Sequence, residues 1–407
     1  MKLKKIPAEY RQALPILEKI VKAGHEAYFV GGSVRDVLLN HPIHDVDIAT
    51  SAFPEEIKQI FPKTIDVGIE HGTVLVLEKS GQYEITTFRT ESIYQDFRRP
   101  EQVEFVRSLK KDLQRRDFTI NAFAIREDGE IIDLFNGLED LDNHILRAVG
   151  NPYERFSEDA LRMMRGLRFV SQLGFTLEEK TFEAIKENSQ LLQKISVERI
   201  HTEFVKLLLG EYRKKGIQNF VASYCFSYCP GLAGKENELL ALASLPEKTI
   251  EYESQAWVLL IDQLAMKEAD IRTFLKGWKC SNEMIKTVQA VFHGLQIRKQ
   301  QAFTADALYQ LGESQAILVE GLLPFYDKLP DFEKVRSDYQ QLPIHSLKEL
   351  AVNGHDLMEY FDKKPGSWLK KQLNDLENAV LHGQIANRKE DLLHAAKRKQ
   401  ADLEKGC

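Results

Sequence analysis

The sequence is poor in cysteine, and it contains no apolar run that approaches the roughly 20 residues of a membrane-spanning helix. Cys225 and Cys229 form one C-x3-C pair, but neither a second pair nor histidines stand at the spacing of zinc ligands. We therefore expect Cys225, Cys229, Cys280 and Cys407 to be free thiols. Because the basic first residues are followed by no apolar segment typical of a secretion signal, we expect a soluble, cytoplasmic protein without a membrane partner.

Excess positive charge is also missing, since the formal net charge is −6. Such a chain does not bind nucleic acid through bulk charge, so any contact with nucleic acid must depend on local basic patches. The content of 43% hydrophobic and 29% charged residues is that of an ordinary globular protein. A length of 407 residues exceeds the roughly 250 to 300 residues of a single core, which predicts more than one domain.

The spacing of apolar residues changes along the chain. A helical pattern covers residues 10–24. Short segments rich in β-branched and aromatic residues then predict strands at 26–30, 46–49, 73–77, 83–88 and 131–134. Beyond about residue 150 the patterns are amphipathic and helical, and no segment is convincing as a strand. The predicted fold is an α/β (α+β) head with a small mixed sheet, followed by an all-helical remainder.

A glycine-rich turn stands between a predicted strand that ends at Val30 and a predicted helix. Glycine lets a ligand approach the backbone closely, and the N–H groups at the start of a helix attract an anion. Arg35, on the predicted helix, can donate two hydrogen bonds to phosphate oxygens. Gly31, Gly32 and Arg35 are therefore candidates for a phosphate site, although most Gly-Gly pairs are simple turns.

Asp45 and Asp47 are two residues apart on a predicted strand, so both carboxylates should project from one side while Val46 and Ile48 enter the core. Neighbouring carboxylates repel each other unless a cation lies between them, and oxygen ligands suit Mg²⁺. The alternative is the polar outer face of an edge strand. Beside a phosphate site, the pair favours metal-dependent phosphoryl or nucleotidyl transfer. Glu84, on a later predicted strand, is a candidate for a third carboxylate.

Five motifs resemble, in order, those of the class II (bacterial-type) tRNA nucleotidyltransferases, the CCA-adding enzymes. The first joins the glycine turn to the aspartate pair, and the others are Arg115–Ala122, Asp133–Gly137, Glu158–Arg165 and Ser196–Glu203. Together they cover about residues 25 to 205, and five ordered motifs make a chance similarity improbable.

The resemblance implies four parts: a catalytic nucleotidyltransferase head (1–147), a base-recognising neck (148–213), a helical body (214–300) and a helical tail that contacts tRNA (301–407). It implies that the protein adds C, C and A without a template to the 3′ end of tRNA from CTP and ATP and releases pyrophosphate. Asp45 and Asp47 would then be the catalytic residues and hold two Mg²⁺ ions. Whether the chain is a monomer or a homodimer stays open.

Asp159 and Arg162 are three residues apart on a predicted helix and so lie on one face, with Gly166 nearby leaving room for a planar base. A carboxylate accepts from an exocyclic amino group, and a guanidinium donates to a ring nitrogen. Cytosine and adenine both present this order of groups, whereas uracil and guanine present a carbonyl instead of the amino group. The alternative is an ordinary surface ion pair.

By resemblance, the nucleotide pocket also contains Arg116, Asp117, Asn121, Arg165 and Arg168. Helical geometry supports Arg165 only as a border residue and places Arg168 about opposite Asp159. Arg168 can instead hold a loop or a phosphate, and Arg116 can instead form a structural pair with Asp117.

Two charged segments bear on RNA binding. Residues 88–118 contain many arginines and lysines mixed with acids, which fits a solvated loop; in the family this region carries a flexible loop that helps the pocket switch from C to A. The basic run at 388–399 is either a helix surface or a contact to the tRNA backbone.

Three other functions are alternatives to CCA addition. Poly(A) polymerase shares the first two motifs, and some enzymes of the family add only A or only CC. A non-enzymatic RNA-binding protein is disfavoured, because Asp45, Asp47, Asp159 and Arg162 are all present.

Overall fold

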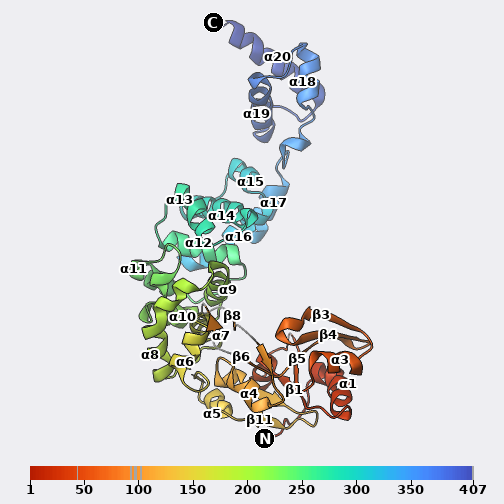
Figure 1. Cartoon of the computed structure of the whole chain (residues 1–407). Coiled ribbons are helices and arrows are strands. Elements are labelled where there is room, and N and C mark those ends of the chain that lie inside the picture. The colour runs from red at the N-terminus through yellow and green to blue at the C-terminus, as the bar shows by residue number, and fades with distance from the viewer. Residues whose placement is uncertain (44, 92–93, 96–98, 101–102, 406–407) are drawn as a thin grey trace. The chain divides into compact units, whose positions relative to one another are not determined.

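The computed structural model describes residues 1–43, 45–91, 94–95, 99–100 and 103–405. It contains two compact units (Figure 1), one formed by Met1–Ile250 with Gly277–Lys279 and the other by Glu251–Lys276 with the chain from Cys280 onward. The finer division into neck, body and tail stays a prediction. No helix within the described residues is both long and apolar enough to cross a membrane.

The head of the first unit is built on a mixed sheet with the strand order β11-β10-β1-β2-β5-β4-β3 in the described part of the chain. Strands β2 and β5 are parallel, and the other neighbours are antiparallel. The strands are β1 (Ala27–Val30), β2 (Asp47–Thr50), β3 (Thr64–Gly68), β4 (Thr73–Glu78), β5 (Gly81–Thr87), β10 (Phe123–Ile125) and β11 (Ile131–Asp133).

Helices cover both faces of this sheet. On one face, Tyr10 of α1 (Ala8–Lys22) stacks on Phe29 of β1 with a distance of 4.1 Å between ring centroids. On the other face, Leu109 and Leu113 of α4 (Leu109–Gln114) pack in a cluster with Ala49 of β2. The remaining elements of the head are α2 (Gly32–Leu38), α3 (Pro54–Ile60), α5 (Gly137–Asp142) and the short strands β6 (Arg89–Glu91), β7 (Tyr94–Gln95), β8 (Arg99–Pro100) and β9 (Val103–Phe105).

The fold class predicted from the sequence is confirmed, and the predicted strands are present with ends shifted by one or two residues. β3 was not predicted because it is a largely exposed edge strand that contains a glycine and an aspartate. β10 was not predicted because it has three residues that are all buried, which leaves no alternation to recognise.

Helices follow the head in the first unit: α6 (Pro152–Glu158), α7 (Leu161–Leu173), α8 (Glu179–Asn188), α9 (Val197–Leu208), α10 (Arg213–Ala222) and α11 (Glu236–Ala243). The expectation of no strand beyond residue 150 is wrong in one place, because β13 (Thr176–Leu177) pairs in parallel with β12 (Ile145–Leu146). Two residues are too few to give a pattern in the sequence.

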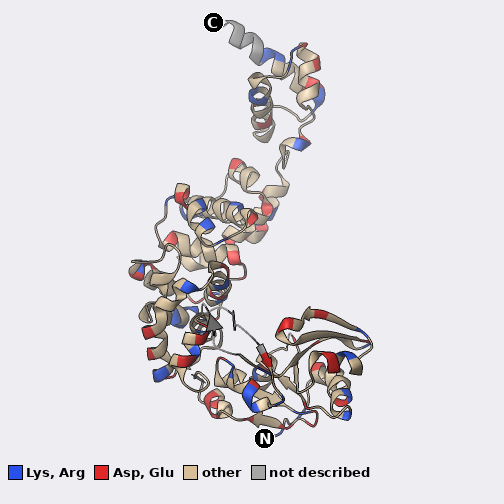
Figure 2. Cartoon of the chain, in the orientation of Figure 1, with Lys and Arg blue, Asp and Glu red and all other residues tan. Residues whose placement is uncertain are grey.

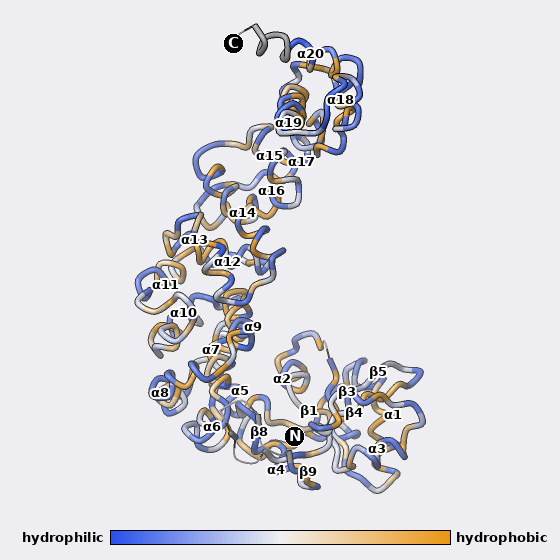
Figure 3. Tube along the Cα trace, turned by 45° about the horizontal axis from the view of Figure 1, so that its top comes forward, coloured by the Kyte–Doolittle hydropathy of each residue, from blue (hydrophilic) through white to orange (hydrophobic). Residues whose placement is uncertain are grey.

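The second unit is helical in its described residues, and apolar and polar segments alternate along its helices (Figure 3). A cluster that includes Leu357, Leu376 and Leu392 forms a core near the C-terminus. The helices are α12 (Glu253–Gln263), α13 (Glu268–Gly277), α14 (Asn282–Gln300), α15 (Ala305–Leu311), α16 (Glu313–Glu320), α17 (Phe332–Gln340), α18 (Gly354–Phe361), α19 (Ser367–Leu381) and α20 (Lys389–Lys405).

The expectation about thiols is confirmed for the described cysteines, because Cys225, Cys229 and Cys280 are all free. Cys407 lies outside the described residues. Acidic and basic residues are interspersed over both units (Figure 2).

Candidate active site

The glycine turn lies at the end of β1, where Gly31 adopts a φ of +80° that favours glycine. A Cβ atom on Gly31 would lie 3.1 Å from Oδ2 of Asp47, so the missing side chain also makes room for this carboxylate. Ser33 is held by Tyr10, whose hydroxyl group donates to it over 3.0 Å, and itself donates to the carbonyl of Val30 over 3.1 Å. The buried hydroxyl groups of Tyr10 and Ser33 therefore hold the turn in place.

Asp47 is the first residue of β2 and is paired in register with Val30 of β1. Asp45 lies before the strand rather than on it, and it is exposed. The prediction that both carboxylates project from one strand is therefore wrong in detail, and Val46 is half-buried instead of lying in the core. The two carboxylates are nevertheless near enough for Asp45 to raise the pKa of Asp47.

A third carboxylate adds to this negative charge. The register of β2 on β5 pairs Ile48 with Ile85, which brings Glu84 beside Asp47. Asp47 is exposed at the surface, but the protein around it removes enough water to raise its pKa; Arg116 opposes this shift, and Glu84 and Asp45 add to it. Carboxylate oxygens are the ligands that Mg²⁺ prefers, and a divalent cation would relieve the repulsion between these groups. The chemistry of the residues therefore fits magnesium, although within the described residues the ligand atoms of Asp45, Asp47 and Glu84 do not all lie within 4.8 Å of one another.

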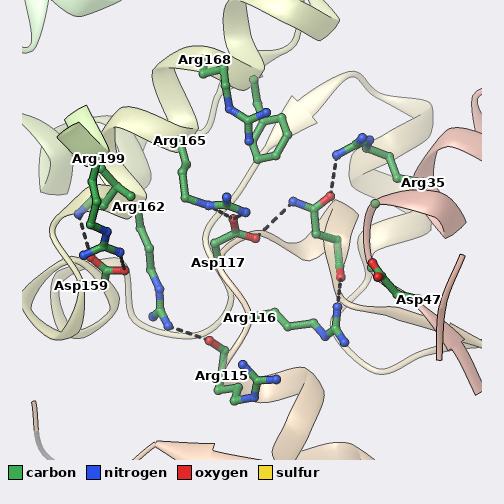
Figure 4. Close-up of a pocket in the computed structure, with 15 residues that line it drawn as sticks. Arg35, Asp47, Arg115, Arg116, Asp117, Asp159, Arg162, Arg165, Arg168 and Arg199 are labelled. Atoms are coloured by element: carbon green, nitrogen blue, oxygen red, sulfur yellow. Dashed lines mark hydrogen bonds and ion pairs between the residues drawn. The ribbon is translucent and has the colours of Figure 1, made fainter. Parts of the chain in front are cut away.

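A cavity of about 530 Å³ extends from Asp47 to the helices that follow the head (Figure 4). Among the described residues, its lining contains seven arginines and three aspartates. This charge suits a polyanionic ligand such as a nucleoside triphosphate. The lining residues are Gly31, Gly32, Arg35, Asp47, Arg115, Arg116, Asp117, Asn121, Asp159, Leu161, Arg162, Arg165, Arg168, Phe169 and Arg199.

Asn121 connects two of the arginines nearest the glycine turn. Its side-chain oxygen accepts from Nη1 of Arg35 over 2.8 Å, and its carbonyl accepts from Nη1 of Arg116 over 3.3 Å. Its amide nitrogen donates to Asp117 over 3.1 Å. Asn121 therefore sets the spacing of two guanidinium groups in the cavity.

Asp117 is buried and accepts hydrogen bonds from the backbone N–H of Phe118 and from Nε of Arg165, at 2.8 and 2.7 Å. Burial acts against ionisation, but Arg165 and the hydrogen bonds prevail and lower the pKa of Asp117 to about 2. This aspartate thus holds Arg165 of α7 against the head, and the alternative pair of Asp117 with Arg116 is not formed. Arg116 instead donates to Asp112 over 3.2 Å.

Asp159 and Arg162 both line the cavity, but Asp159 is not on the helix that carries Arg162. It has an extended backbone between α6 and α7 and accepts from the N–H of Leu161. Its other oxygen accepts from Nη2 of Arg199 over 2.9 Å. Arg162 donates to Glu158 over 2.9 Å and to the carbonyl of Arg115 over 2.8 Å. The prediction that both residues lie on one helix is therefore wrong, and each side chain is held by partners of its own.

The expectation for Gly166 is wrong. A Cβ atom there would lie 3.0 Å from the ring of Phe118 and 3.6 Å from Ile185, so the missing side chain makes room for core packing and not for a base. Arg168, which helical geometry placed away from Asp159, does line the cavity. It forms an ion pair with Glu203 of α9 at 2.6 Å.

Sequence reasoning missed four lining residues: Arg115, Leu161, Phe169 and Arg199. Arg115 and Arg199 belong to the second and fifth motifs, so the motifs themselves could have marked them. Nothing in the sequence marks Phe169, whose ring lies 5.2 Å from Arg35 and 4.0 Å from Arg168. The charged loop predicted at 88–118 includes residues 92–93, 96–98 and 101–102, which lie outside the described residues; strands β6 and β9 pair at its base.

Family models match three parts of the chain. Residues 27–147 match the poly(A) polymerase head domain, residues 174–234 a probable RNA- and SrmB-binding site of polymerase A, and residues 248–396 a putative domain 2 of tRNA nucleotidyltransferase. The head model thus contains Asp45, Asp47 and the residues around Asn121.

Curated relatives match over the whole length. A CCA-adding enzyme of Enterococcus faecalis is 56% identical over 405 residues, which is 100% of both chains. A CCA-adding enzyme of Streptococcus agalactiae is 53% identical over 399 residues, 98% of this chain and 99% of the relative.

Solved structures are similar as well. The Bacillus stearothermophilus CCA-adding enzyme in complex with CTP is 42% identical with a TM-score of 0.91, and the match covers 99% of this chain and 100% of that one. A tRNA nucleotidyltransferase in complex with a primer tRNA and an incoming ATP analog is 25% identical with a TM-score of 0.60, over 80% and 98% of the two chains.

Proposed function

The chain belongs to the CCA-adding enzymes, the class II tRNA nucleotidyltransferases, and we propose that it adds C, C and A in turn to the 3′ end of tRNA from CTP and ATP. The observation that carries the proposal is that one cavity contains both Asp47 at the glycine turn and the pair Asp159 and Arg162. A nucleotide can therefore reach the carboxylate with its inner phosphate while its base meets the two side chains.

Asp45 and Asp47, with Glu84 beside them, are the residues that would hold Mg²⁺. When bound, such ions orient the α-phosphate, favour deprotonation of the attacking hydroxyl group and stabilise the leaving pyrophosphate. Gly31 and Gly32 give the phosphates access to the backbone, and Arg35 and Arg116 offer guanidinium groups at spacings that Asn121 sets.

In the reaction, the 3′-oxygen of the RNA bonds to the α-phosphorus of the nucleotide while the bond to the β-phosphate oxygen breaks. Pyrophosphate leaves, and the hydroxyl proton passes to solvent. No covalent intermediate with the protein is needed, because the chain's contribution is to hold both reactants in line.

Base selection follows from the partners of the two reading residues. Arg199 and the N–H of Leu161 fix the two oxygens of Asp159, so the carboxylate remains an acceptor that requires an amino group on the base. Glu158 and the Arg115 carbonyl fix Arg162 as the donor to the neighbouring ring nitrogen. Cytosine and adenine satisfy both groups, whereas uracil and guanine present a carbonyl to the carboxylate.

The basic middle of α20, with exposed Lys397 and Arg398, supports a contact of the second unit with the tRNA backbone. The addition of A alone, of CC alone, or of a poly(A) tract are the alternative activities. The oligomeric state, monomer or homodimer, stays a prediction.

The test is incubation with labelled CTP or ATP and tRNAs that end in the discriminator base, in C or in CC, with and without EDTA. We expect two C and one A to be incorporated, and no incorporation with EDTA until excess Mg²⁺ is added. A long A tract, A alone or CC alone selects one of the alternatives, and no incorporation with Mg²⁺ contradicts enzymatic activity.

A further inference from the structure

Another cavity, of about 210 Å³, meets the first one at Asp47. The two cavities share Asp47, Arg115 and Arg116, but the lining of this one includes strand residues in place of Asp159 and Arg162. It therefore adjoins the reaction centre on the side of the sheet and lacks the residues that read the base. It is less than half as large as the nucleotide cavity.

Two threonines lie on the floor of this cavity. Asp47 and Ala49 share a face of β2, Ala49 is paired with Thr86 of β5, and Thr86 is paired with Thr73 of β4. Asp47, Thr86 and Thr73 therefore face the same side of the sheet. The side-chain oxygens of Thr73 and Thr86 are 3.0 Å apart, and both residues are half-buried.

A pair of hydroxyl groups can bind a third one. Whichever threonine donates within the pair, the other accepts and retains its own hydrogen, so the pair still offers a donor and acceptor lone pairs to a ligand. Three arginines also line the cavity, and each is already engaged by a protein acceptor. The buried carboxylate of Asp112 contacts Arg115 at 2.9 Å and Arg116 at 3.2 Å, and Arg89 donates to the carbonyl of His71. The cavity thus offers two neutral hydroxyl groups beside cations that already have partners, and these hydroxyl groups can bind those of a sugar.

The position agrees with the geometry of the reaction. In phosphoryl transfer, the attacking and leaving oxygens lie on opposite sides of the phosphorus atom. When the base of the nucleotide is at Asp159 and its α-phosphate is at Asp47, a hydroxyl group that approaches Asp47 from outside the nucleotide cavity can lie on the side away from the leaving pyrophosphate. The smaller cavity opens at that point.

We propose that this cavity binds the ribose of the 3′-terminal nucleotide of the RNA acceptor, and that the Thr73–Thr86 pair contacts its 2′-hydroxyl group. The inference rests on the proposed function and deepens it. The threonine pair would make the enzyme prefer an acceptor that ends in a ribonucleotide, because a 2′-deoxy terminus leaves the two hydroxyl groups without their ligand partner.

The test compares two tRNA acceptors that differ in one atom, the 2′-oxygen of the last nucleotide, while both keep the 3′-hydroxyl group. For the wild-type protein we expect kcat/KM to be about ten-fold lower with the deoxy terminus, the size of one well-made hydrogen bond. In Thr86→Val and Thr73→Val, which keep the branched shape, we expect the ratio of the two kcat/KM values to approach one, with the KM for CTP unchanged.

Thr64→Val on β3 is the matched control, since Thr64 is half-buried in the same sheet but lines neither cavity. It should keep the wild-type ratio. Equal use of the two acceptors by the wild-type protein, or an unchanged ratio in both threonine variants, overturns the inference even if C and A are added normally. Failure to add any nucleotide to the ribose-ended acceptor contradicts the proposed function instead, and circular dichroism shows whether each variant is folded.

Discussion

At the scale of single residues, most charged groups of the site are already paired before any ligand is present. Asp117 holds Arg165, Asp159 holds Arg199, and Glu203 lies against Arg168. Such pairs reduce the reorganisation that accompanies the binding of a nucleotide, which is one way in which an enzyme stabilises a developing charge. Asp47 differs, because its neighbours Asp45 and Glu84 add negative charge to it.

This difference predicts the effect of changing Asp47. We expect Asp47→Asn to lower the turnover number by a factor on the order of 10³, because a neutral amide is a poor ligand for Mg²⁺. Binding of tRNA in a filter assay should remain within a few fold of the wild-type value. Asp66→Asn on the exposed strand β3 is the control and should retain activity; wild-type turnover in Asp47→Asn would refute the catalytic role.

Asp159 is predicted to determine which bases are accepted. We expect Asp159→Ala to reduce discrimination against UTP and GTP by about 1 to 3 kcal/mol, the usual range for losing one partner of a buried hydrogen bond. The measurement is the ratio of kcat/KM for CTP to that for UTP. Glu154→Ala on the exposed side of α6 is the control, and an unchanged ratio in Asp159→Ala would show that the base is read elsewhere.

Asp117 gives the stability a pH dependence. Although burial opposes its ionisation, its partners lower its pKa from 3.8 to about 2, so its contribution is complete above pH 4 and is lost as the pH falls towards 2. The shift corresponds to about 2 kcal/mol. We expect the urea midpoint of the wild-type protein to fall more steeply between pH 4 and 2 than that of Asp117→Asn. Parallel curves for the two proteins would contradict this assignment.

At the scale of elements, Gly137 determines how α5 begins. A Cβ atom on this residue would lie 2.5 Å from the carbonyl oxygen of Thr119 and 2.8 Å from the ring of Phe123. Thr119 lies in the same short helical turn as Asn121, which lines the cavity. The close approach of α5 to this turn therefore depends on the absence of a side chain.

We expect Gly137→Ala to destabilise the protein by about 1 to 3 kcal/mol, as overpacking usually does, and to raise the KM for both CTP and ATP. Chemical denaturation measures the first effect and steady-state kinetics the second. Gly68→Ala, where the nearest atom would be 3.8 Å away, is the matched control. Equal stability of the two variants would mean that α5 can move away at little cost.

The elements also show how far the sequence could predict the structure. β1, β2, β4 and β5 were recognised because branched and aromatic residues alternate or cluster in them, and the glycine turn followed from their order. The break between α6 and α7 was not recognised, because no proline or glycine stands at Asp159. Its extended backbone is stabilised by partners that are distant in the sequence, such as Arg199.

The same reason explains which site residues were found. Gly31, Gly32, Arg35 and Asp47 are close in sequence as well as in space, so local patterns sufficed. The contacts of Arg162 and Arg168 depend on the tertiary packing of α7 against the head and α9. The place of Arg168 in the pocket could be carried over from the family but not worked out from helical spacing. Helical spacing did place Arg162 beside Asp159, although the helix that it assumed is broken at Asp159.

At the scale of the whole molecule, an acidic chain must bind an acidic RNA through local positive charge. The net charge is −6, yet the last described helix carries exposed Lys397 and Arg398. Contacts of this kind are weakened by salt, because each one releases counterions from the RNA. The affinity for tRNA therefore depends on where the positive charges lie and not on the net charge of the chain.

We expect the double change Lys397→Gln and Arg398→Gln to weaken tRNA binding several fold at about 0.1 M salt and to reduce the slope of log Kd against log salt by about 1 to 2. Addition of C to a short acceptor hairpin should remain unchanged. Lys334→Gln with Arg336→Gln on α17 provides a control of equal charge. Identical slopes for all three proteins would exclude a contact at Lys397 and Arg398 of α20.

The support of Arg162 by the carbonyl oxygen of Arg115 has a consequence for laboratory evolution. A main-chain oxygen is retained whatever amino acid is encoded at position 115, so no point mutation can delete this acceptor. Selection for a variant that adds other nucleotides to RNA should therefore yield changes at Asp159, Glu158 or Arg162 themselves. Libraries that randomise position 115 alone should give slower enzymes with unchanged nucleotide specificity.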